Sequence, residues 1–261
     1  MNQPFKLFEV AAFIILILLF SGLTYKKNYI WKDELSLWTD VIKKSPKKAR
    51  AHLALGISYN KKGLYEKAES ECRKTLSLNP HEPMAYLEIG LILQRRGLLD
   101  EAVSEYKKAL QLKPDYVEAY NNIGVIYKEK GLIDDAIAYY GKAVALKPYN
   151  EKYIGLYNNL ARALREKGLV DKAIAMHEMT LQSKPDDAGT RNDLGICYFD
   201  KGWVDKAIEQ FKIAIEIEPA NPDFHYNLGI AYGEKGLFDL ASEEMIKGKA
   251  LGSTRGTATS D

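Results

Sequence analysis

The chain has 261 residues, of which 46% are hydrophobic and 28% are charged, and it contains only 9 prolines. This composition excludes a disordered or collagen-like chain. The 37 basic and 35 acidic residues leave a formal charge of +2, which argues against nucleic acid as a partner because phosphate binding needs a strongly basic surface.

The first predicted element is a membrane-spanning helix over residues 7–25, within an anchor region of residues 1–30. Residues 10–23 read VAAFIILILLFSGL, which carries no charge and is apolar on every face of a helix. About 20 mostly apolar residues suffice to cross a bilayer. A cleaved signal peptide is the alternative, although no small-x-small cleavage pattern follows Phe20.

The charges beside this segment set its expected orientation. Lys6 precedes it, and Lys26, Lys27 and Lys32 follow it. The positive-inside rule therefore places the rest of this single-pass membrane protein in the cytoplasm. The alternative is a periplasmic or luminal body, because a short amino-terminal tail with one lysine can also stay inside.

Residues 31–48 are predicted to form one amphipathic helix and the turn that follows it. Trp38, Val41 and Pro46 match the positions of core residues and proline in the second half of the repeated unit described next. We therefore expect a half-repeat that caps the array. It joins the array to the anchor without a Gly/Ser linker, so the array should lie close to the bilayer.

A unit of 34 residues repeats six times over residues 49–251. A basic residue, a glycine and a large apolar residue recur together, with the glycines 34, 34, 37, 34 and 34 residues apart. Such a period is typical of stacked helical hairpins. The predicted units are residues 49–82, 83–116, 117–150, 151–187, 188–221 and 222–251.

Residues 117–150 illustrate the expected hairpin. One helix is predicted from about Val117 to Lys130, ending at Gly131, and a second from about Asp134 to Leu146, before Pro148. Gly131 can take the left-handed conformation that closes a helix. The aspartates at one repeated position are expected to cap the second helices: they are Asp100, Asp134, Asp171, Asp205 and Asp239.

The sequence of this unit also predicts which residues pack in the seam, the contact between its two helices. Gly124 and Ala136 are small, as close approach of antiparallel helices requires. Large apolar residues are spaced to fill the seam, namely Tyr120, Ile123, Tyr127, Tyr140 and Leu146.

These residues resemble the tetratricopeptide repeat family, whose pattern the third unit follows at Tyr120, Ile123, Gly124, Tyr127, Ala136, Tyr140, Ala143 and Pro148. The resemblance implies an all-α fold, a right-handed α-solenoid of about six helix-turn-helix units. The fourth unit departs from the pattern, with three extra residues near 149–153 and with Ala161, Leu164 and His177 at pattern positions. We expect a local irregularity and a bend there.

The sequence holds no arrangement typical of catalysis. It has no phosphate-binding glycine loop, no nucleophile elbow and no HExxH motif. Packing positions explain His52, His177 and His225, and Cys72 and Cys197 have no neighbouring ligand residues. We therefore predict a protein that is not an enzyme, with no catalytic residue, cofactor or metal site.

In the family, the first helices line a concave groove that binds a partner protein or peptide. Asparagines recur there and resemble the asparagine ladder of O-linked N-acetylglucosamine transferase, which implies contacts to a peptide backbone. The predicted groove residues of this row are Asn121, Asn122, Asn158, Asn159, Asn192, Asp193 and Asn227. The alternative is that these side chains solvate a helix face or satisfy contacts between repeats.

A basic set, Arg162 and Arg165 with Lys128 nearby, adds anionic peptide recognition as a further hypothesis. The family's clamp for chaperone tails is absent, because Leu53 and Glu118 stand at two of its basic positions.

At the other end, residues 252–261 are predicted to be a disordered tail. The last helix carries Leu240, Met245, Ile246 and Leu251, which would leave apolar surface for a partner or for a homo-oligomer through the C-terminal repeat. Together these features predict a membrane-anchored scaffold that binds a peptide or helix of a partner. The alternatives are a non-catalytic subunit of an envelope glycosylation or secretion complex, or a self-assembling protein.

Overall fold

The computed structural model describes residues 33–146 and 153–252, and within these ranges the chain is helical, with 13 helices and no strand. The helices form two compact units that divide between Pro114 and Asp115. The first contains α2 (Glu34–Lys44), α3 (Ala49–Lys61), α4 (Tyr65–Leu78), α5 (Pro83–Arg95) and α6 (Leu99–Leu112). The second contains α7 (Val117–Glu129), α8 (Ile133–Leu146), α9 (Ile154–Glu166), α10 (Val170–Ser183), α11 (Ala188–Asp200), α12 (Val204–Ile217), α13 (Pro222–Glu234) and α14 (Phe238–Ala250).

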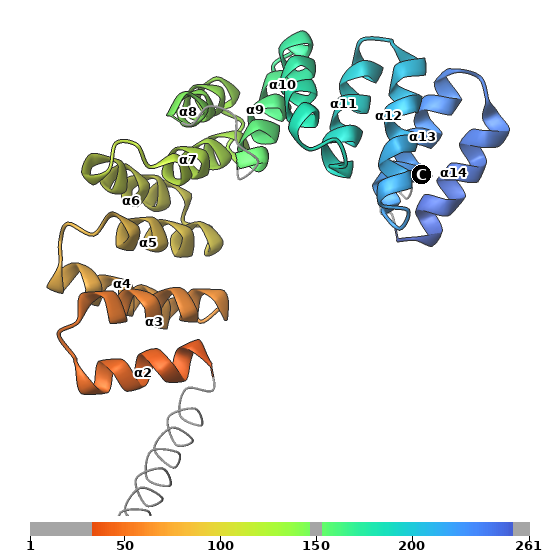
Figure 1. Cartoon of the computed structure of the whole chain (residues 1–261). Helices are drawn as coiled ribbons and strands as arrows, with labels where there is room; N and C mark the ends of the chain where they lie inside the picture. The colour runs from red at the N-terminus through yellow and green to blue at the C-terminus, as the bar shows by residue number, and fades with distance from the viewer. Residues whose placement is uncertain (1–32, 147–152, 253–261) are drawn as a thin grey trace, which may run out of the picture. The chain divides into compact units, whose positions relative to one another are not determined.

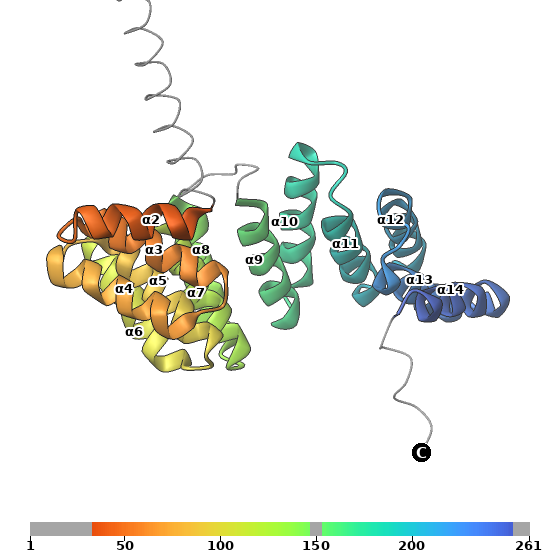
Figure 2. The same cartoon turned by 90° about the horizontal axis from the view of Figure 1, so that it is seen from below.

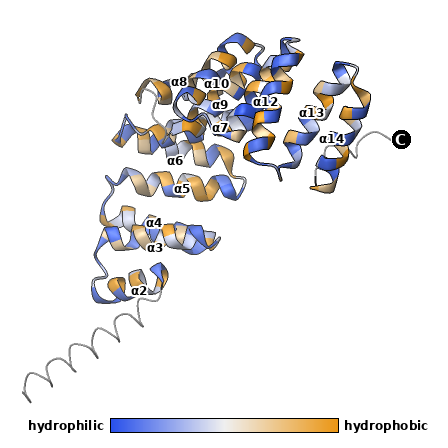
Figure 3. Cartoon of the chain, turned by 45° about the vertical axis from the view of Figure 1, so that its right-hand side comes forward, coloured by the Kyte–Doolittle hydropathy of each residue, from blue (hydrophilic) through white to orange (hydrophobic). Residues whose placement is uncertain are grey.

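The twelve helices from α3 to α14 pair into six hairpins, and within each unit the second helix of a hairpin packs against the first helix of the next. Neighbouring helices accordingly lie side by side in chain order within each unit (Figures 1 and 2). Hydrophobic and hydrophilic residues alternate around the helices, as Figure 3 shows. Each helix packs one face against its neighbours and exposes the other to solvent. The predicted all-α helical repeat array is confirmed.

Glycine closes the first helix of every hairpin, as predicted. The six turn glycines have φ between 73° and 82°, the left-handed region that a side chain disfavours. At Gly131, the glycine N–H donates to the Lys128 carbonyl at 2.9 Å, and the Leu132 N–H donates to the Tyr127 carbonyl at 2.8 Å. These two bonds satisfy carbonyls that the helix end leaves without partners.

The prediction that the repeated aspartates cap the second helices is wrong for α6, α10, α12 and α14. Their cap residues are Leu98, Leu169, Trp203 and Leu237, and none of these makes a side-chain cap bond. The glycine turn leaves only one residue before the helix starts, so the aspartate already lies inside the first turn. There Asp171 accepts from Lys201 of the next hairpin at 2.9 Å. Asp134 pairs in the same way with Lys167, and Asp205 with Lys235.

In three hairpins, a glycine of the first helix is required by an aromatic ring of the second helix. A Cβ added at Gly124 would lie 2.6 Å from Cε1 of Tyr140, and one at Gly195 would lie 2.6 Å from Cε1 of Phe211. Atoms do not approach so closely, so only glycine fits beneath these rings. Tyr140 and Ile123 are fully buried, which confirms their predicted place in the core.

One helix, α2, lies within residues 31–48, where the half-repeat is predicted, and it packs on α3. Its start is fixed by a reciprocal cap: the Asp33 carboxylate accepts from the Ser36 N–H at 2.8 Å, and the Ser36 hydroxyl accepts from the Asp33 N–H at 3.1 Å. Glu34 bonds to Lys61 on α3 at 3.1 Å. The side chains of Trp38 and Val41 are half-buried.

Three predictions fall on residues outside the described ranges. They are the membrane helix of residues 7–25, the disordered tail beyond Gly252 and the extra residues of the fourth unit near position 149. Among the residues that the structure describes, none of the helices is both long enough and apolar enough to span a bilayer.

Candidate functional site

The first helices of the second unit line a cavity of about 790 Å³. It is formed by α7, α9, α11 and α13, together with the segments that lead into α11 and α13. The lining residues are Lys128, Arg162, Arg165, Glu166, Asp187, Gly189, Asn192, Asp193, Ile196, Asp200, Glu218, Asn221, Asp223 and Phe224. Five of the predicted groove residues are therefore brought together here: Lys128, Arg162, Arg165, Asn192 and Asp193.

A second hollow of about 410 Å³ adjoins the first and shares Arg165, Ile196 and Asp200 with it. Phe199, Phe211, Asn227 and Ile230 complete its lining, so it is the more apolar of the two. Asn227 is the predicted groove residue that lines this hollow. We use the name groove for the two hollows together.

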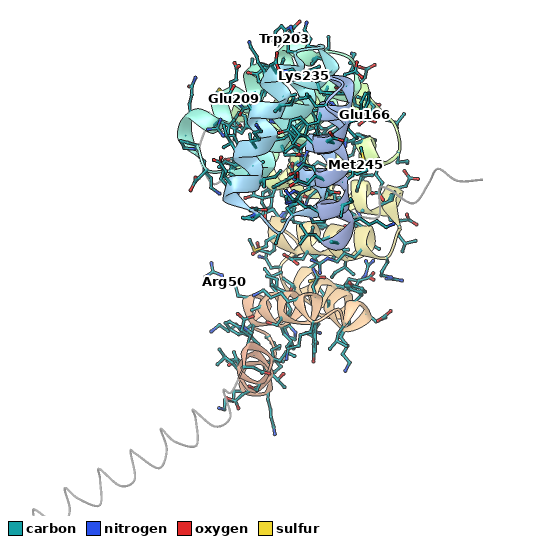
Figure 4. The ribbon with its side chains drawn as sticks, turned by 90° about the vertical axis from the view of Figure 1, so that its right-hand side faces the viewer. Arg50, Glu166, Trp203, Glu209, Lys235 and Met245 are labelled. Atoms are coloured by element: carbon teal, nitrogen blue, oxygen red, sulfur yellow. The ribbon has the colours of Figure 1, made fainter. Side chains whose placement is uncertain are left out.

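Each basic side chain of the groove is paired with a carboxylate. Arg162 Nε donates to Asp193 at 2.7 Å, and Arg165 Nε donates to Asp200 at 2.5 Å. Lys128 Nζ lies 3.6 Å from the Glu166 carboxylate, which Figure 4 labels. The hypothesis of anionic peptide recognition gains no support from this arrangement, because a carboxylate already meets each positive charge.

Burial of the Asp193 carboxylate beside Arg162 costs desolvation free energy. The Asp193 side chain is only 12% exposed, and burial raises the pKa of its carboxyl although Arg162 lowers it in opposition. Removing a charge from water is unfavourable, and the bond to Arg162 offsets part of that cost. The pair therefore fixes the position of both side chains between α9 and α11.

The asparagines connect neighbouring first helices to one another. The Asn158 side chain donates to the Thr190 hydroxyl at 2.8 Å, which joins α9 to α11. The Asn227 side chain donates to the side-chain oxygen Oδ1 of Asn192 at 2.8 Å, which joins α13 to α11. Asn159 donates to Asn121 at 3.1 Å, and Asn121 lies 3.5 Å from the oxygen of Asn122. These bonds agree with the alternative that the asparagines satisfy contacts between repeats. A role for them in partner binding stays a prediction.

Sequence reasoning missed several lining residues, above all Asp200, Glu218 and Phe224. A signal for Asp200 was present, since Arg165 and Asp200 are 35 residues apart and Arg162 and Asp193 are 31 apart. Charges of opposite sign separated by about one repeat meet on adjacent first helices. Glu218 and Phe224 flank the start of α13, where the repeat pattern alone gives no reason to expect a groove.

His52, His177 and His225 are buried, as predicted, and Cys72 and Cys197 are buried as well. His52 and His225 are each bonded to a glutamate at 2.6 Å, namely Glu71 and Glu244. Burial and the nearby Arg162 and Arg165 lower the pKa of His177 to about 4. Burial raises the pKa of Cys72 and of Cys197 to about 12, which leaves both thiols protonated and unreactive.

Family models match most of the array. A model described as TPR repeat matches residues 90–131 and 197–236. Three models described as tetratricopeptide repeat match residues 35–83, 117–150 and 156–191. No curated protein matches the sequence.

Solved structures share this fold. A crystal structure of MamA is 30% identical, with a TM-score of 0.56, and the match covers 62% of this chain and 94% of that one. YrrB, described as a TPR protein with an unusual peptide-binding site, is 24% identical, with a TM-score of 0.57 and coverage of 69% and 92%. PilW, described as a widely conserved type IV pilus biogenesis factor, is 22% identical, with a TM-score of 0.69 and coverage of 77% and 92%. The chain belongs to the tetratricopeptide repeat family.

Proposed function

We propose that this protein is a scaffold without catalytic activity that binds a segment of a partner protein in the groove of its second unit and holds the partner at a membrane. The observation that carries the proposal is the groove itself, a cavity of about 790 Å³ with an adjoining hollow on the first helices. The larger cavity is lined mainly by polar and charged side chains and the adjoining hollow mainly by apolar ones, a mixture that suits recognition of a polypeptide surface.

The groove is organised before any partner arrives. The pairs Arg162–Asp193 and Arg165–Asp200 fix long side chains that otherwise lose freedom on binding. Ordering one such side chain at an interface costs about 0.5–1.5 kcal/mol. A preformed surface therefore leaves more of the contact energy for the partner.

The comparisons support the class of function and not a particular partner. YrrB is described as having a peptide-binding site, and PilW is described as a factor in pilus biogenesis. A likeness of fold supports the same class of activity for this chain, whereas the partner has to be argued from the groove residues of this chain itself.

A bulky side chain in the groove tests its role. Gly189 lines the cavity at the second position of α11, and an added Cβ there would meet only Asp187, at 3.6 Å. Gly155 holds the same position in α9, lies outside the cavity lining and has open space around it. Gly189→Trp and Gly155→Trp are therefore a matched pair.

The experiment is chemical crosslinking of full-length protein in its native membranes, followed by identification of the attached proteins. A partner that attaches to the wild type and to Gly155→Trp but not to Gly189→Trp supports binding in the groove. Equal attachment to all three proteins would show that the groove is not the binding surface. Circular dichroism checks that both variants keep the helical fold.

Residues 7–25 are proposed to anchor the protein by a single span, with the repeats in the cytoplasm and a periplasmic or luminal body as the alternative. The full chain should resist carbonate extraction from membranes, whereas a chain without residues 1–30 should be released. Protease added to sealed cells or vesicles then reports the side on which the repeats lie. Release of the full chain by carbonate would contradict a retained anchor.

A second candidate function, docking or self-assembly through the last helix, is favoured by one observation. Phe238 is 72% exposed and Ile246 is 68% exposed, and Met245 on the same helix is partly exposed (Figure 4). Sedimentation of the full chain in detergent tests self-assembly. A larger species that Phe238→Ser with Ile246→Ser converts to monomer supports it, and a monomer at every concentration rules it out.

A further inference from the structure

The turns that lead into α11 and α13 form part of the wall of the larger cavity. Asp187 and Gly189 line the cavity where α11 begins, and Glu218, Asn221 and Phe224 line it where α13 begins. Each turn is bonded to a side chain of the helix that follows it. The contacts that hold these turns therefore help to set the shape of the groove.

Arg191 on α11 holds the first of these turns between two acceptors. Its Nε donates to the Pro185 carbonyl at 3.0 Å, and its Nη1 donates to the Gln210 side-chain oxygen at 2.9 Å. We call such a side chain, with its two acceptors, a turn bridge. A guanidinium has only donors and stays charged across the pH range in which proteins are folded. This turn bridge is therefore independent of pH.

His225 on α13 forms the equivalent turn bridge one repeat later. Its Nε2 lies 3.0 Å from the Pro219 carbonyl oxygen, and its Nδ1 lies 2.6 Å from the Glu244 carboxylate. In both bridges the carbonyl lies six residues before the bridging residue, and the side-chain acceptor lies nineteen residues after it. His52 in the first unit makes the same two contacts, at 2.9 Å and 2.6 Å.

Both partners of His225 accept hydrogen bonds and donate none. Burial acts to raise the pKa of the Glu244 carboxyl, but bonds from Lys247 and His225 lower it below its usual value. An ionised carboxylate is only an acceptor, as is the carbonyl on the other side of the ring. A neutral imidazole has one donor nitrogen, so it can satisfy only one of these partners. The two contacts together require the doubly protonated ring, in the place that a guanidinium takes one repeat earlier.

The surroundings of the His225 ring come from three other elements. From α14, Glu244 bonds to the ring, and Lys247 lies 2.8 Å from the same carboxylate. The turn after α12 contributes a carbonyl, and α11 meets α13 through the neutral side chain of Asn192. On α13 itself, Asp223 precedes the ring by two residues. The Glu244 carboxylate is thus the charged group in direct contact with the ring.

Loss of one proton from the ring would break one particular contact. The remaining proton stays on Nδ1, because a hydrogen bond to a carboxylate is stronger than one to a neutral carbonyl. Nε2 of His225 then presents a lone pair to the Pro219 carbonyl oxygen, and two acceptors at this distance repel each other. The turn before α13 would lose its bond, while the turn before α11 keeps the bond to Arg191.

We propose that His225 makes one wall of the groove sensitive to pH, holding the α12–α13 turn while its ring carries two protons and releasing the turn as the pH rises. The contact is present below the pH at which the ring loses its second proton and is lost above it. The consequence for binding rests on the proposed function: a partner segment should bind more tightly at low pH, because a released turn has to be ordered again on binding.

Hydrogen exchange of the full chain in detergent, followed by mass spectrometry, tests the two turns side by side. One amide in each turn donates to a carbonyl of the same turn, namely the Asn221 N–H at 3.2 Å and the Asp187 N–H at 3.3 Å. Protection is expressed relative to the intrinsic exchange rate at each pH. Between about pH 6 and about pH 9, protection should fall about tenfold in the turn before α13 and less than about twofold in the turn before α11.

Exchanging the two turn bridges supplies the matched variants. His225→Arg with Glu244→Gln places the pair of the α11–α12 hairpin in the last hairpin and should make the turn before α13 insensitive to pH. Arg191→His with Gln210→Glu does the reverse and should make the turn before α11 lose protection as the pH rises. Circular dichroism checks that both double variants keep the helical fold.

Several results would overturn the proposal. They are an equal pH response of the two turns in the wild type, an unchanged response in His225→Arg with Glu244→Gln, and a turn before α11 that stays insensitive in Arg191→His with Gln210→Glu. Nitrogen NMR of the histidine rings gives a direct reading, since one unprotonated nitrogen in His225 at about pH 6 would also overturn it.

These measurements need no partner, so they separate this inference from the proposed function. A partner that attaches equally to Gly189→Trp and to the wild type would overturn groove binding and leave the pH response of the turn standing. Conversely, a turn before α13 that ignores pH would overturn the role of His225 and leave binding in the groove intact.

Discussion

The hairpin α9–α10 differs from the hairpins before and after it in how its seam is filled. In α7–α8 and α11–α12, a glycine of the first helix lies beneath an aromatic ring of the second, as in the pair Gly195 and Phe211. In α9–α10 the equivalent positions hold Ala161 and His177, both buried. Ala161 is larger than the glycine of the neighbouring hairpins, and the His177 ring is smaller than a Phe or Tyr ring. Both kinds of pair therefore fill the space between the two helices.

The difference has an electrostatic consequence. His177 donates from Nδ1 to the Asn158 oxygen at 3.3 Å, while its Nε2 is buried and has no hydrogen-bond partner in the described part of the chain. Arg162 and Arg165, the groove's cations on α9, add to the effect of burial in lowering the pKa of His177. The hairpin that supplies both arginines of the groove therefore has a histidine ring in the seam where its neighbours have Tyr140 and Phe211.

The largest effect is expected from emptying a regular seam. Phe211 is 2% exposed, and its replacement by Ala should cost about 3–5 kcal/mol of unfolding free energy because the ring leaves a cavity above Gly195. Phe238→Ala is the matched control, since that ring is 72% exposed. Urea unfolding followed by circular dichroism measures both. Similar losses in the two variants would contradict the assigned packing.

The irregular seam should instead respond to pH. The folded-state pKa of His177 is lowered from 6.5 to about 4, so between these values the unfolded chain binds a proton that the folded chain does not. The contribution of neutral His177 to the unfolding free energy is therefore fully present above the pKa of the unfolded chain. It is lost as the pH falls towards the pKa of the folded chain. The loss over this window is about 3 kcal/mol, at about 1.4 kcal/mol per pH unit.

Carboxylates also titrate in this range, so the measurement needs a reference. The double variant Ala161→Gly with His177→Phe places the regular pair in the α9–α10 seam and removes the histidine. Between neutral pH and pH 4, its unfolding free energy should fall less than that of the wild type. The difference should equal the loss of about 3 kcal/mol attributed to His177. Parallel pH curves would show that His177 does not cause the loss.

The repeat pattern predicted the hairpins because it records backbone and packing requirements that every unit shares. Gly131 needs a positive φ and Gly124 must accept the Tyr140 ring, and each requirement restricts a single position to one residue type. Asp134 is a different case, because a carboxylate near a helix start suits either a cap or a pair with the next hairpin. The start of α8 at Ile133 decides between the two roles, because it places Asp134 inside the first turn, where it pairs with Lys167.

The groove was less predictable than the fold for a related reason. Asparagine has a donor and an acceptor, and Asn192 and Asn227 use them on each other across neighbouring helices. The sequence shows that such residues share a face, but it does not show whether they bond to a partner or among themselves. The place of Glu218 in the cavity lining depends on where α13 begins relative to α11, which repeat spacing alone does not give.

A double-mutant cycle sharpens the comparison of seams at a smaller energy. His177→Phe alone should destabilise the protein by about 1–3 kcal/mol, because the ring would press on the Ala161 side chain. Ala161→Gly alone should be mildly destabilising through helix propensity and lost packing. Together they should cost less than the sum of the two, with a coupling of about 1 kcal/mol or more. Additive costs would show that positions 161 and 177 do not compensate each other.

The smallest effect is expected at the turns, where the irregular hairpin is like its neighbours. The carboxylate of Asp171 on α10 pairs with Lys201, and that of Asp205 on α12 pairs with Lys235, and both carboxylates are largely exposed. Asp171→Asn and Asp205→Asn should each cost less than about 1 kcal/mol, because water and salt screen exposed pairs. Concentrated salt should remove most of either cost. A much larger loss for Asp171→Asn would mean that this ion pair supports the altered seam of α9–α10, and the two kinds of hairpin would then differ at the turn as well as in the core.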